Sequence, residues 1–149
     1  MSKDGGFFGK VIAVDFSESM LGEVIKRAKE EDCPDFDVVR ADVANMPFCD
    51  ASVDAIHSGA ALHCWPSVQD GLAQVARVIK PGGKFFATTF LWGIPDEAVS
   101  LGENLSSVSG RRAYRFFSPT ELEYLMKSAG FSSVEVEQLD RCAIIRCIR

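Results

Sequence analysis

The feature that most constrains the fold is the run Val11–Leu21, in which a short β-branched strand pattern ends at one carboxylate and a helix start follows at once. A continuous apolar run of this kind is typical of a strand that is buried on both faces of a parallel sheet. Ligands of open α/β sheets bind outside the carboxyl ends of such strands, where an acid can hold a ribose diol. Asp15 is therefore the leading candidate for a ligand contact, with a solvated turn carboxylate or a helix N-terminal charge as the equally weighted alternative.

The segment ahead of this strand is short for a nucleotide-binding unit. Such a unit places a strand, a glycine-rich turn and a helix before the acid, with about 20 residues between the glycines and the acid. Only fourteen residues precede Asp15, and Gly5, Gly6 and Gly9 are spaced as G-G-x-x-G, not as G-x-G-x-x-G. Residues 1–10 are therefore expected to form a flexible lead-in instead of a phosphate loop.

Strand and helix patterns alternate after Asp15 in the order that α/β proteins show. This alternation favours right-handed crossovers and a mostly parallel sheet. The last two strand patterns follow each other directly, which predicts an antiparallel hairpin at the sheet edge. Each predicted helix follows a serine that can cap it. The strands predicted after Asp15 are 36–43, 52–59, 84–90, 134–139 and 142–148, and the helices start after Ser17, Ser67 and Ser118.

Two further local signals bear on packing. The turn residues 81–83, Pro-Gly-Gly, are expected to break the second helix and turn the chain into the strand 84–90. The first helix has apolar residues at helical spacing, which predicts one buried face. That face consists of Met20, Leu21, Val24, Ile25 and Ala28.

Residues 91–117 interrupt the alternation with proline, glycine and serine, so an insertion or lid is predicted there. Arg111, Arg112 and Arg115 make this segment locally basic. A solvated face is favoured over a carboxylate-binding clamp, because a charge run alone is weak evidence for a site.

Length and composition narrow the function classes. A chain of 149 residues fits a single domain, here 1–149. The net charge of -5 argues against a nucleic-acid partner, because such proteins usually carry a basic patch. No apolar run is long enough to span a membrane, and no secretory signal opens the chain. The expected location is the cytoplasm or a plastid, and the protein is not expected to be secreted.

Cysteine and histidine spacing gives no sign of a metal site or a disulfide framework. The five cysteines are widely spaced, and His57 and His63 lie six residues apart. Reduced thiols in a reducing compartment are expected, and no metal is expected.

Four segments in order resemble the later motifs of class I S-adenosylmethionine-dependent methyltransferases. They read V-I-A-V-D-F-S-E-S-M-L, A-D-V-A-N-M-P-F, S-V-D-A-I-H-S-G-A-A-L-H and V-I-K-P-G-G-K-F-F-A-T-T. The small-molecule group that contains ubiquinone and menaquinone methyltransferase-like proteins is the most similar branch. The segment F-F-S-P-T-E-L-E-Y-L-M-K-S-A-G-F also resembles plant and algal plastid members. The resemblance implies a Rossmann-like fold and S-adenosylmethionine as cofactor.

The resemblance also implies roles for particular residues. Asp15 corresponds to the acid that holds both ribose hydroxyls, and Phe16 to the apolar residue beside the adenine. Asp42 corresponds to the carboxylate that accepts the adenine amino group, and Val43 to a contact on the ring. The remaining cofactor contacts, near its methionine part, are Ser58 and Gly59.

A general base is a further expectation for acceptors that must lose a proton. His63 is the candidate, since it follows the strand that ends at Gly59. A core imidazole or one at a helix start is the favoured alternative for a histidine with no visible partner. Trp65 and Trp92 are candidates for an apolar acceptor pocket, although large aromatics are more often core residues.

The chain departs from the family at its start, because the first strand and the Gly-rich loop of the family have no counterpart before Asp15. The chain is therefore expected to be an N-terminally truncated methyltransferase domain, or one completed by a partner strand or by a second copy. The expected activity is methyl transfer to a small, apolar or aromatic acceptor. The alternative is a non-catalytic methyltransferase-like fragment that acts as an interaction module; a dehydrogenase is a weaker third possibility.

Overall fold

The computed structural model describes residues 9–32, 36–91 and 115–149. The predicted lead-in up to residue 8 and most of the predicted insertion, residues 92–114, lie outside these ranges. The chain divides into two compact units, Met1–Pro47 and Phe48–Arg149. The prediction of a single domain therefore stays a prediction.

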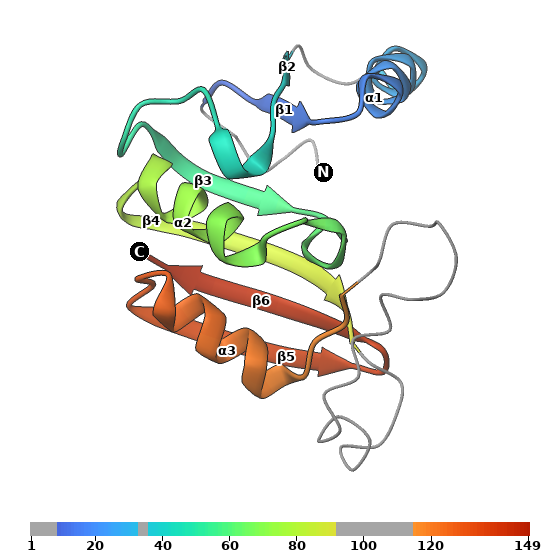
Figure 1. Ribbon diagram of the computed structural model, residues 1–149. Coiled ribbons are helices and arrows are strands. Elements are labelled where there is room, and N and C mark those ends of the chain that lie inside the picture. The colour runs from blue at the N-terminus through green and yellow to red at the C-terminus, as the bar shows by residue number, and fades with distance from the viewer. Residues whose placement is uncertain (1–8, 33–35, 92–114) are drawn as a thin grey trace. The chain divides into compact units, whose positions relative to one another are not determined.

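The first unit is a strand-helix-strand element. Strands β1 (Ile12–Asp15) and β2 (Asp37–Arg40) pair in parallel, with helix α1 (Glu18–Glu30) between them in sequence (Figure 1). The Ser17 side chain accepts a hydrogen bond from the Met20 amide at 3.4 Å, which confirms the predicted cap. β2 is shorter than predicted, because Asp42 caps the 3₁₀ helix η1 (Val43–Asn45) and turns the backbone out of the strand.

The apolar face predicted for α1 is largely uncovered. Leu21 is the buried residue of this helix, whereas Met20 is 54% exposed. Val24 and Ile25 are exposed as well. The expectation that this face is buried is therefore wrong for most of its residues. The physical reason is that a two-stranded sheet offers little surface against which a helix of this length can pack.

The second unit is built on a four-stranded sheet with the order β3-β4-β6-β5 (Figure 1). β3 and β4 are parallel, whereas β6 is antiparallel to both β4 and β5. The predicted C-terminal hairpin is thereby confirmed. The elements are β3 (Val53–Ser58), η2 (Leu62–Cys64), α2 (Val68–Val78), β4 (Ile79–Phe90), α3 (Pro119–Ser128), β5 (Ser133–Leu139) and β6 (Cys142–Ile148).

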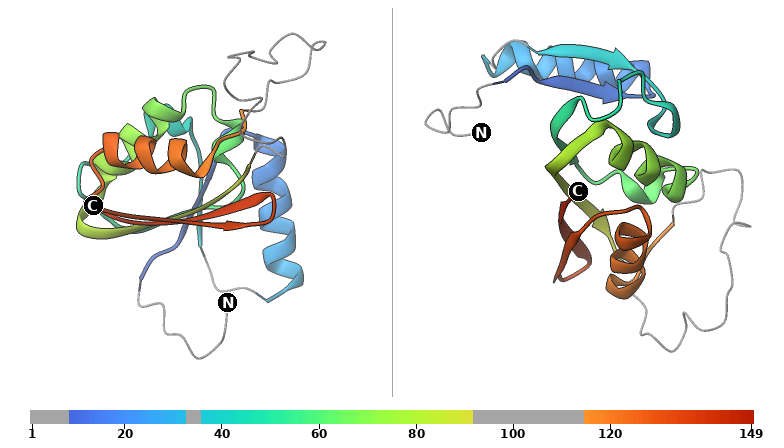
Figure 2. Two further views of the ribbon diagram at one scale, coloured as in Figure 1. Left: turned by 90° about the horizontal axis from the view of Figure 1, so that it is seen from below. Right: turned by 90° about the vertical axis from the view of Figure 1, so that its left-hand side faces the viewer.

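Helices α2 and α3 lie on the same face of this sheet, where the core of the unit forms (Figure 2). Both predicted caps are present, since Ser67 accepts from the Asp70 amide and Ser118 from the Glu121 amide, each at 3.2 Å. Hydrophobic burial between the helices and the sheet stabilises the unit. The fully buried side chains include Leu72, Val75, Phe85, Leu122, Met126 and Ile145.

The Pro-Gly-Gly segment lies inside β4 and not before it. β4 begins at Ile79, directly after α2, so the predicted start at residue 84 is wrong. The pairing with β3 shifts register here, since Val53 pairs with Ile79 whereas Ala55 pairs with Lys84. The segment therefore lies within the strand as an irregularity and does not form the separate turn that its residues predict. Gly82 adopts a positive φ of 78°, which a residue with a side chain rarely does.

Within the described ranges, β1 pairs with β2 alone and β3 pairs with β4 alone. Each of these strands thus has one edge without a partner strand among the described residues. Among the residues from Gly9 onward that the structure describes, no strand precedes β1. The mixed α/β class with an antiparallel C-terminal hairpin is confirmed.

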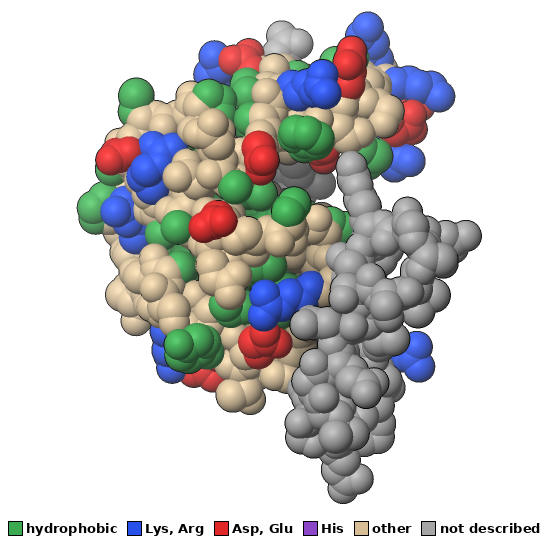
Figure 3. Space-filling model, in the orientation of Figure 1, with side chains coloured by type: hydrophobic (Ala, Val, Ile, Leu, Met, Phe, Trp, Pro, Cys, Tyr) green, Lys and Arg blue, Asp and Glu red, His purple; other side chains and the backbone are tan. Residues whose placement is uncertain are grey.

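Charged side chains of both signs are interspersed over the described part of the surface that Figure 3 presents. Many form exposed ion pairs, such as Lys80 with Asp54 at 2.7 Å and Lys127 with Glu123 at 2.5 Å. Of the helices in the described ranges, none is both long and apolar enough to cross a membrane.

Candidate functional site

In the first unit, the carboxyl end of β1 places Asp15 at the position where a ligand of an α/β sheet binds. Its side chain is half-buried, and its Oδ1 accepts a hydrogen bond from the Ser17 amide at 2.7 Å. This contact fixes the carboxylate at the start of α1. A carboxylate offers about four lone-pair positions, so the group keeps acceptor capacity for a diol.

Asp42, which follows the next strand β2, accepts an equivalent hydrogen bond. Its Oδ1 accepts from the Ala44 amide at 2.9 Å, again from the residue two positions on, and its side chain is exposed. The Ala41 amide donates to the Asp15 carbonyl at 3.2 Å, which ties the ends of β1 and β2 together. Two carboxylates thus follow neighbouring parallel strands, each anchored through one oxygen.

Phe16 is fixed through its backbone, whereas its ring is exposed. The Nε of Arg40 donates to the Phe16 carbonyl at 3.1 Å, and the guanidinium carbon lies 5.9 Å from the centre of the Phe16 ring. Nη1 of the same arginine contacts Glu18 at 3.3 Å. Phe16 is 60% exposed, so its ring offers an apolar surface next to the Arg40 guanidinium. Val43, the last candidate of this unit, is half-buried in η1.

In the second unit, the predicted contacts Ser58 and Gly59 lie at the carboxyl end of β3. Ser58 is the buried last residue of the strand, and Gly59 is exposed in the loop that follows it. The neighbouring residue Ala60 adopts a positive φ of 47°. Its amide donates to the Thr88 hydroxyl at 2.9 Å, which holds this loop against β4.

His63 lies in η2, shortly after this loop, and is buried with 7% of its surface exposed. Its Nδ1 is 3.3 Å from the Oγ1 of Thr89, and its ring makes a T-shaped contact with Phe90 at 4.9 Å between centroids. Burial lowers the pKa of the imidazole below its ordinary value, because the charged form loses hydration. The contact with Thr89 gives His63 a polar partner that the sequence did not reveal.

Thr88 and Thr89 are the site residues that sequence reasoning missed. Both belong to β4, and they contact the segment after β3 across 28 and 26 positions of sequence. The signal in the sequence is a pair of hydroxyl residues near the end of a strand whose immediately preceding residues are apolar. Thr89 is 1% exposed, so its hydroxyl lies where an unpaired polar group would be costly.

Two other candidates have structural partners. Trp65 lies across Gly71 of α2, with its Cε3 2.5 Å from the position that a Cβ would take, so its ring packs on the helix. The Arg115 guanidinium forms an ion pair with Glu121 at 2.5 Å and lies 5.2 Å from the ring centre of Phe117. Its charge is therefore already paired within the protein. Trp92, Arg111 and Arg112 lie outside the described residues.

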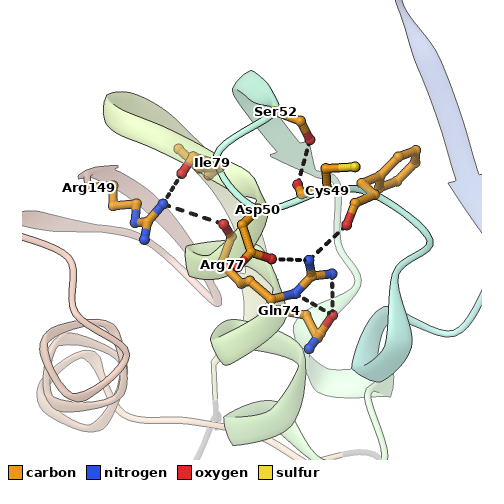
Figure 4. A network of polar contacts seen from close by, with 8 residues as sticks. Cys49, Asp50, Ser52, Gln74, Arg77, Ile79 and Arg149 are labelled. Carbon is orange, nitrogen blue, oxygen red and sulfur yellow. Dashed lines mark hydrogen bonds and ion pairs between the residues drawn. The ribbon is translucent and has the colours of Figure 1, made fainter.

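A polar network fixes the chain that leads into β3 (Figure 4). Arg77 of α2 donates to the Phe48 carbonyl and to Asp50, both at 2.7 Å, and also to Gln74. Arg149 reaches the carbonyls of Arg77 and Ile79 from the end of β6. The network thus joins the entry of β3, the end of α2 and the start of β4. The candidate residues of this unit lie at the opposite ends of β3 and β4.

The structure places the candidates in two sets. Asp15, Phe16, Asp42 and Val43 belong to the first unit, and the contacts between β1 and β2 bring them side by side. Ser58, Gly59 and His63 belong to the second unit and gather at the end of β3. Their ligand-binding roles stay predictions. In the ranges that the structure covers, no group of three or more acidic, histidine or cysteine side chains could hold a metal ion.

Comparison with known proteins identifies the family. Residues 2–87, more than half of the chain, match the model of a methyltransferase domain. A chloroplastic, uncharacterized methyltransferase of Arabidopsis thaliana is 43% identical over 129 residues, which are 83% of this chain and 36% of that protein. The demethylmenaquinone methyltransferase of Staphylococcus saprophyticus is 43% identical over 154 positions, which cover 91% of this chain and 65% of the relative. The chain thus spans from about a third to two thirds of the length of these relatives.

Solved structures show the same fold. The crystal structure of an S-adenosylmethionine-dependent methyltransferase from Aquifex aeolicus matches with a TM-score of 0.68 at 18% identity. The match covers 96% of this chain and 70% of that one. The resemblance to class I S-adenosylmethionine-dependent methyltransferases is confirmed, and the chain belongs to the methyltransferase domain family.

Proposed function

We propose that this chain supplies the adenosine-binding carboxylates and the acceptor-side histidine of an S-adenosylmethionine-dependent methyltransferase that acts on a small, apolar or aromatic molecule. The observation that carries the proposal is the matched pair Asp15 and Asp42. Asp15 ends strand β1 and Asp42 follows the parallel strand β2, and each is anchored through Oδ1, at 2.7 Å and 2.9 Å. Two anchored carboxylates and an exposed aromatic ring in the same unit suit a ribose diol and an adenine.

The donor set fits the cofactor chemically. A carboxylate accepts two hydrogen bonds from a diol, and such charge-assisted bonds are stronger than neutral ones. The exposed ring of Phe16 offers the apolar surface on which a base can lie. When bound, S-adenosylmethionine supplies the electrophilic methyl group, which leaves binding, orientation and exclusion of water to the protein.

His63 is the proposed general base for an acceptor that must lose a proton. A base has to be unprotonated near neutral pH, and burial lowers the pKa of this imidazole and so favours the neutral form. His63 follows the carboxyl end of β3, the edge of an α/β sheet at which ligands bind. Ser58 and Gly59 line the same end and are the proposed contacts near the methionine part of the cofactor.

The names of the relatives support the acceptor class and the compartment. One relative is a demethylmenaquinone methyltransferase, which favours a small apolar or aromatic acceptor. The Arabidopsis relative is chloroplastic, which favours a plastid location over the cytoplasm. A partner that pairs with the open edge of β1 or β3, or a second copy of the chain, belongs to this proposal as well.

The test is a calorimetric titration of the protein as its gene encodes it with S-adenosylmethionine, for the wild type and for Asp15→Asn. The substitution removes the charge and should weaken binding about tenfold or more, since hydrogen bonds to charged groups contribute about 1.5–3 kcal/mol. Asp37→Asn is the matched control, because Asp37 starts β2 at the opposite end and pairs with Lys10 at 2.5 Å.

Equal losses for the two variants would refute the ribose assignment. No binding by the wild type would refute the cofactor proposal and favour a non-catalytic interaction module. The 149-residue chain, titrated in parallel, measures how much of the binding free energy these residues carry on their own.

A further inference from the structure

The end of β4 holds the segment after β3 through three consecutive residues. The Thr88 hydroxyl accepts a hydrogen bond from the Ala60 amide, Thr89 contacts the imidazole of His63, and the Phe90 ring makes a T-shaped contact with the same imidazole. The backbone of His63 is held too, because its carbonyl accepts from the Arg115 amide at 3.0 Å. The position of the imidazole is therefore determined from several sides.

The contact with Thr89 also bears on where the proton of the neutral imidazole lies. A neutral histidine carries one proton, so one ring nitrogen donates and the other accepts. A threonine hydroxyl can do either, and the distance of 3.3 Å from Nδ1 to Oγ1 allows both arrangements. If the hydroxyl accepts from Nδ1–H, the lone pair lies on Nε2; if it donates, Nε2 carries the proton and cannot act as a base.

We propose that Thr89 is a positioning residue whose Oγ1 accepts a hydrogen bond from Nδ1–H of His63, which holds the imidazole in the tautomer with its lone pair on Nε2. This inference rests on the proposed function, since only a base requires that lone pair. The burial of both residues supports it, because a hydrogen bond between neutral groups is stronger where water is excluded.

Arg115 reaches His63 through its amide, while its guanidinium pairs with Glu121. Thr89 and Phe90, the residues of β4 shown against the imidazole, carry no charge. A hydroxyl partner orients the ring without adding a charge that would raise the pKa of the imidazole.

The tautomer can be measured without any activity, by ¹⁵N NMR of histidine-labelled protein at a pH where both imidazoles are neutral. His57 and His63 are the two histidines of the chain, and His57→Gln assigns the signals. Wild-type His63 should show Nδ1 protonated and Nε2 as the unprotonated nitrogen. Thr89→Val should shift His63 toward the Nε2–H tautomer that free histidine prefers, whereas Thr89→Ser should keep the wild-type pattern.

Thr88→Val is the matched control, because it removes a hydroxyl one residue away that does not contact the imidazole. It should leave the tautomer unchanged. An Nε2–H signal in the wild type, or no shift in folded Thr89→Val, would overturn the proposal. Thr89→Ser keeps the test decisive if the valine variant does not fold, because loss of the wild-type pattern there would count against the hydroxyl as the acceptor.

Activity separates this proposal from the proposed function. In an active enzyme, Thr89→Val should lower kcat about tenfold or more with little change in KM, and Thr89→Ser should restore most of it. A shifted tautomer with an unchanged kcat would support the hydrogen bond from His63 to Thr89 and reject His63 as the base. An unshifted tautomer would reject Thr89, whatever the activity.

Discussion

Trp65 lies directly over Gly71, so that a Cβ on this helix residue would come within 2.5 Å of Cε3 and 2.8 Å of Cζ3 of the indole. Because Gly71 has no side chain, the indole can pack against α2 at this position. Trp65 directly follows η2, the 3₁₀ helix that contains His63. The ring is therefore a packing residue of this helix, which accounts for the presence of a glycine in a helix interior despite its cost.

Gly71→Ala should destabilise the protein by about 1–3 kcal/mol, because the added methyl group must displace a packed ring. Gly22→Ala is the matched control in α1, where a Cβ would meet nothing within 4 Å. That variant should be stabilising by about 0.5–1 kcal/mol, since alanine favours a helix. Urea unfolding followed by circular dichroism measures both, and equal effects would contradict the packing role of Trp65.

The buried imidazole of His63 should make stability depend on pH. Burial lowers its folded pKa below 6.5, so the unfolded chain binds more protons in the window between the two values. The stability contribution is complete above pH 6.5 and falls as the pH drops through this window. The difference in unfolding free energy between the wild type and His63→Gln should therefore shrink from pH 7.5 to pH 5. His57→Gln is the control, because His57 is exposed on β3. A difference between the wild type and His63→Gln that does not change with pH would contradict the burial of His63.

The Arg77 network should contribute more than an exposed ion pair. Arg77→Met removes contacts with the Phe48 carbonyl, Asp50 and Gln74, and should cost about 1–3 kcal/mol of unfolding free energy. Lys80→Met removes the exposed pair with Asp54 and should cost less than about 1 kcal/mol. Chemical unfolding of both variants compares them, and a larger loss for Lys80→Met would show that the network does not hold the entry of β3.

The cysteines should differ in reactivity. Cys147 is buried in β6, and burial raises the pKa of its thiol to about 12, so almost no thiolate forms at pH 8. Cys49 and Cys64 are exposed. A short iodoacetamide pulse followed by peptide mass spectrometry should label these two first and Cys147 only in denaturant. Native labelling of Cys147 at the rate of Cys49 would show that β6 opens readily.

Ligand affinity should separate the binding carboxylate from the proposed base. Asp15→Ala should weaken binding of S-adenosylmethionine more than His63→Ala does, because only the first removes a proposed direct contact with the cofactor. Titration calorimetry of the protein as its gene encodes it gives both dissociation constants. Equal or reversed losses would place the cofactor elsewhere.

Local features of this protein could be predicted from the sequence because they depend on neighbouring residues. The caps at Ser17, Ser67 and Ser118 each involve an amide three positions on. The acids at the ends of β1 and β2 follow from the strand pattern and are anchored two positions on. The order of the family motifs identified the methyltransferase fold for the same reason, since each motif is a short continuous segment.

The tertiary structure decided the contacts between distant segments. Thr89 reaches His63 across 26 positions only because β4 lies parallel to β3 and ends at the same edge of the sheet. The start of β4 at Ile79 depends on pairing with Val53, which overrides the turn propensity of Pro-Gly-Gly. The exposed face of α1 is likewise a matter of packing, since amphipathic spacing predicts which residues share a face but not whether a surface is present to cover it.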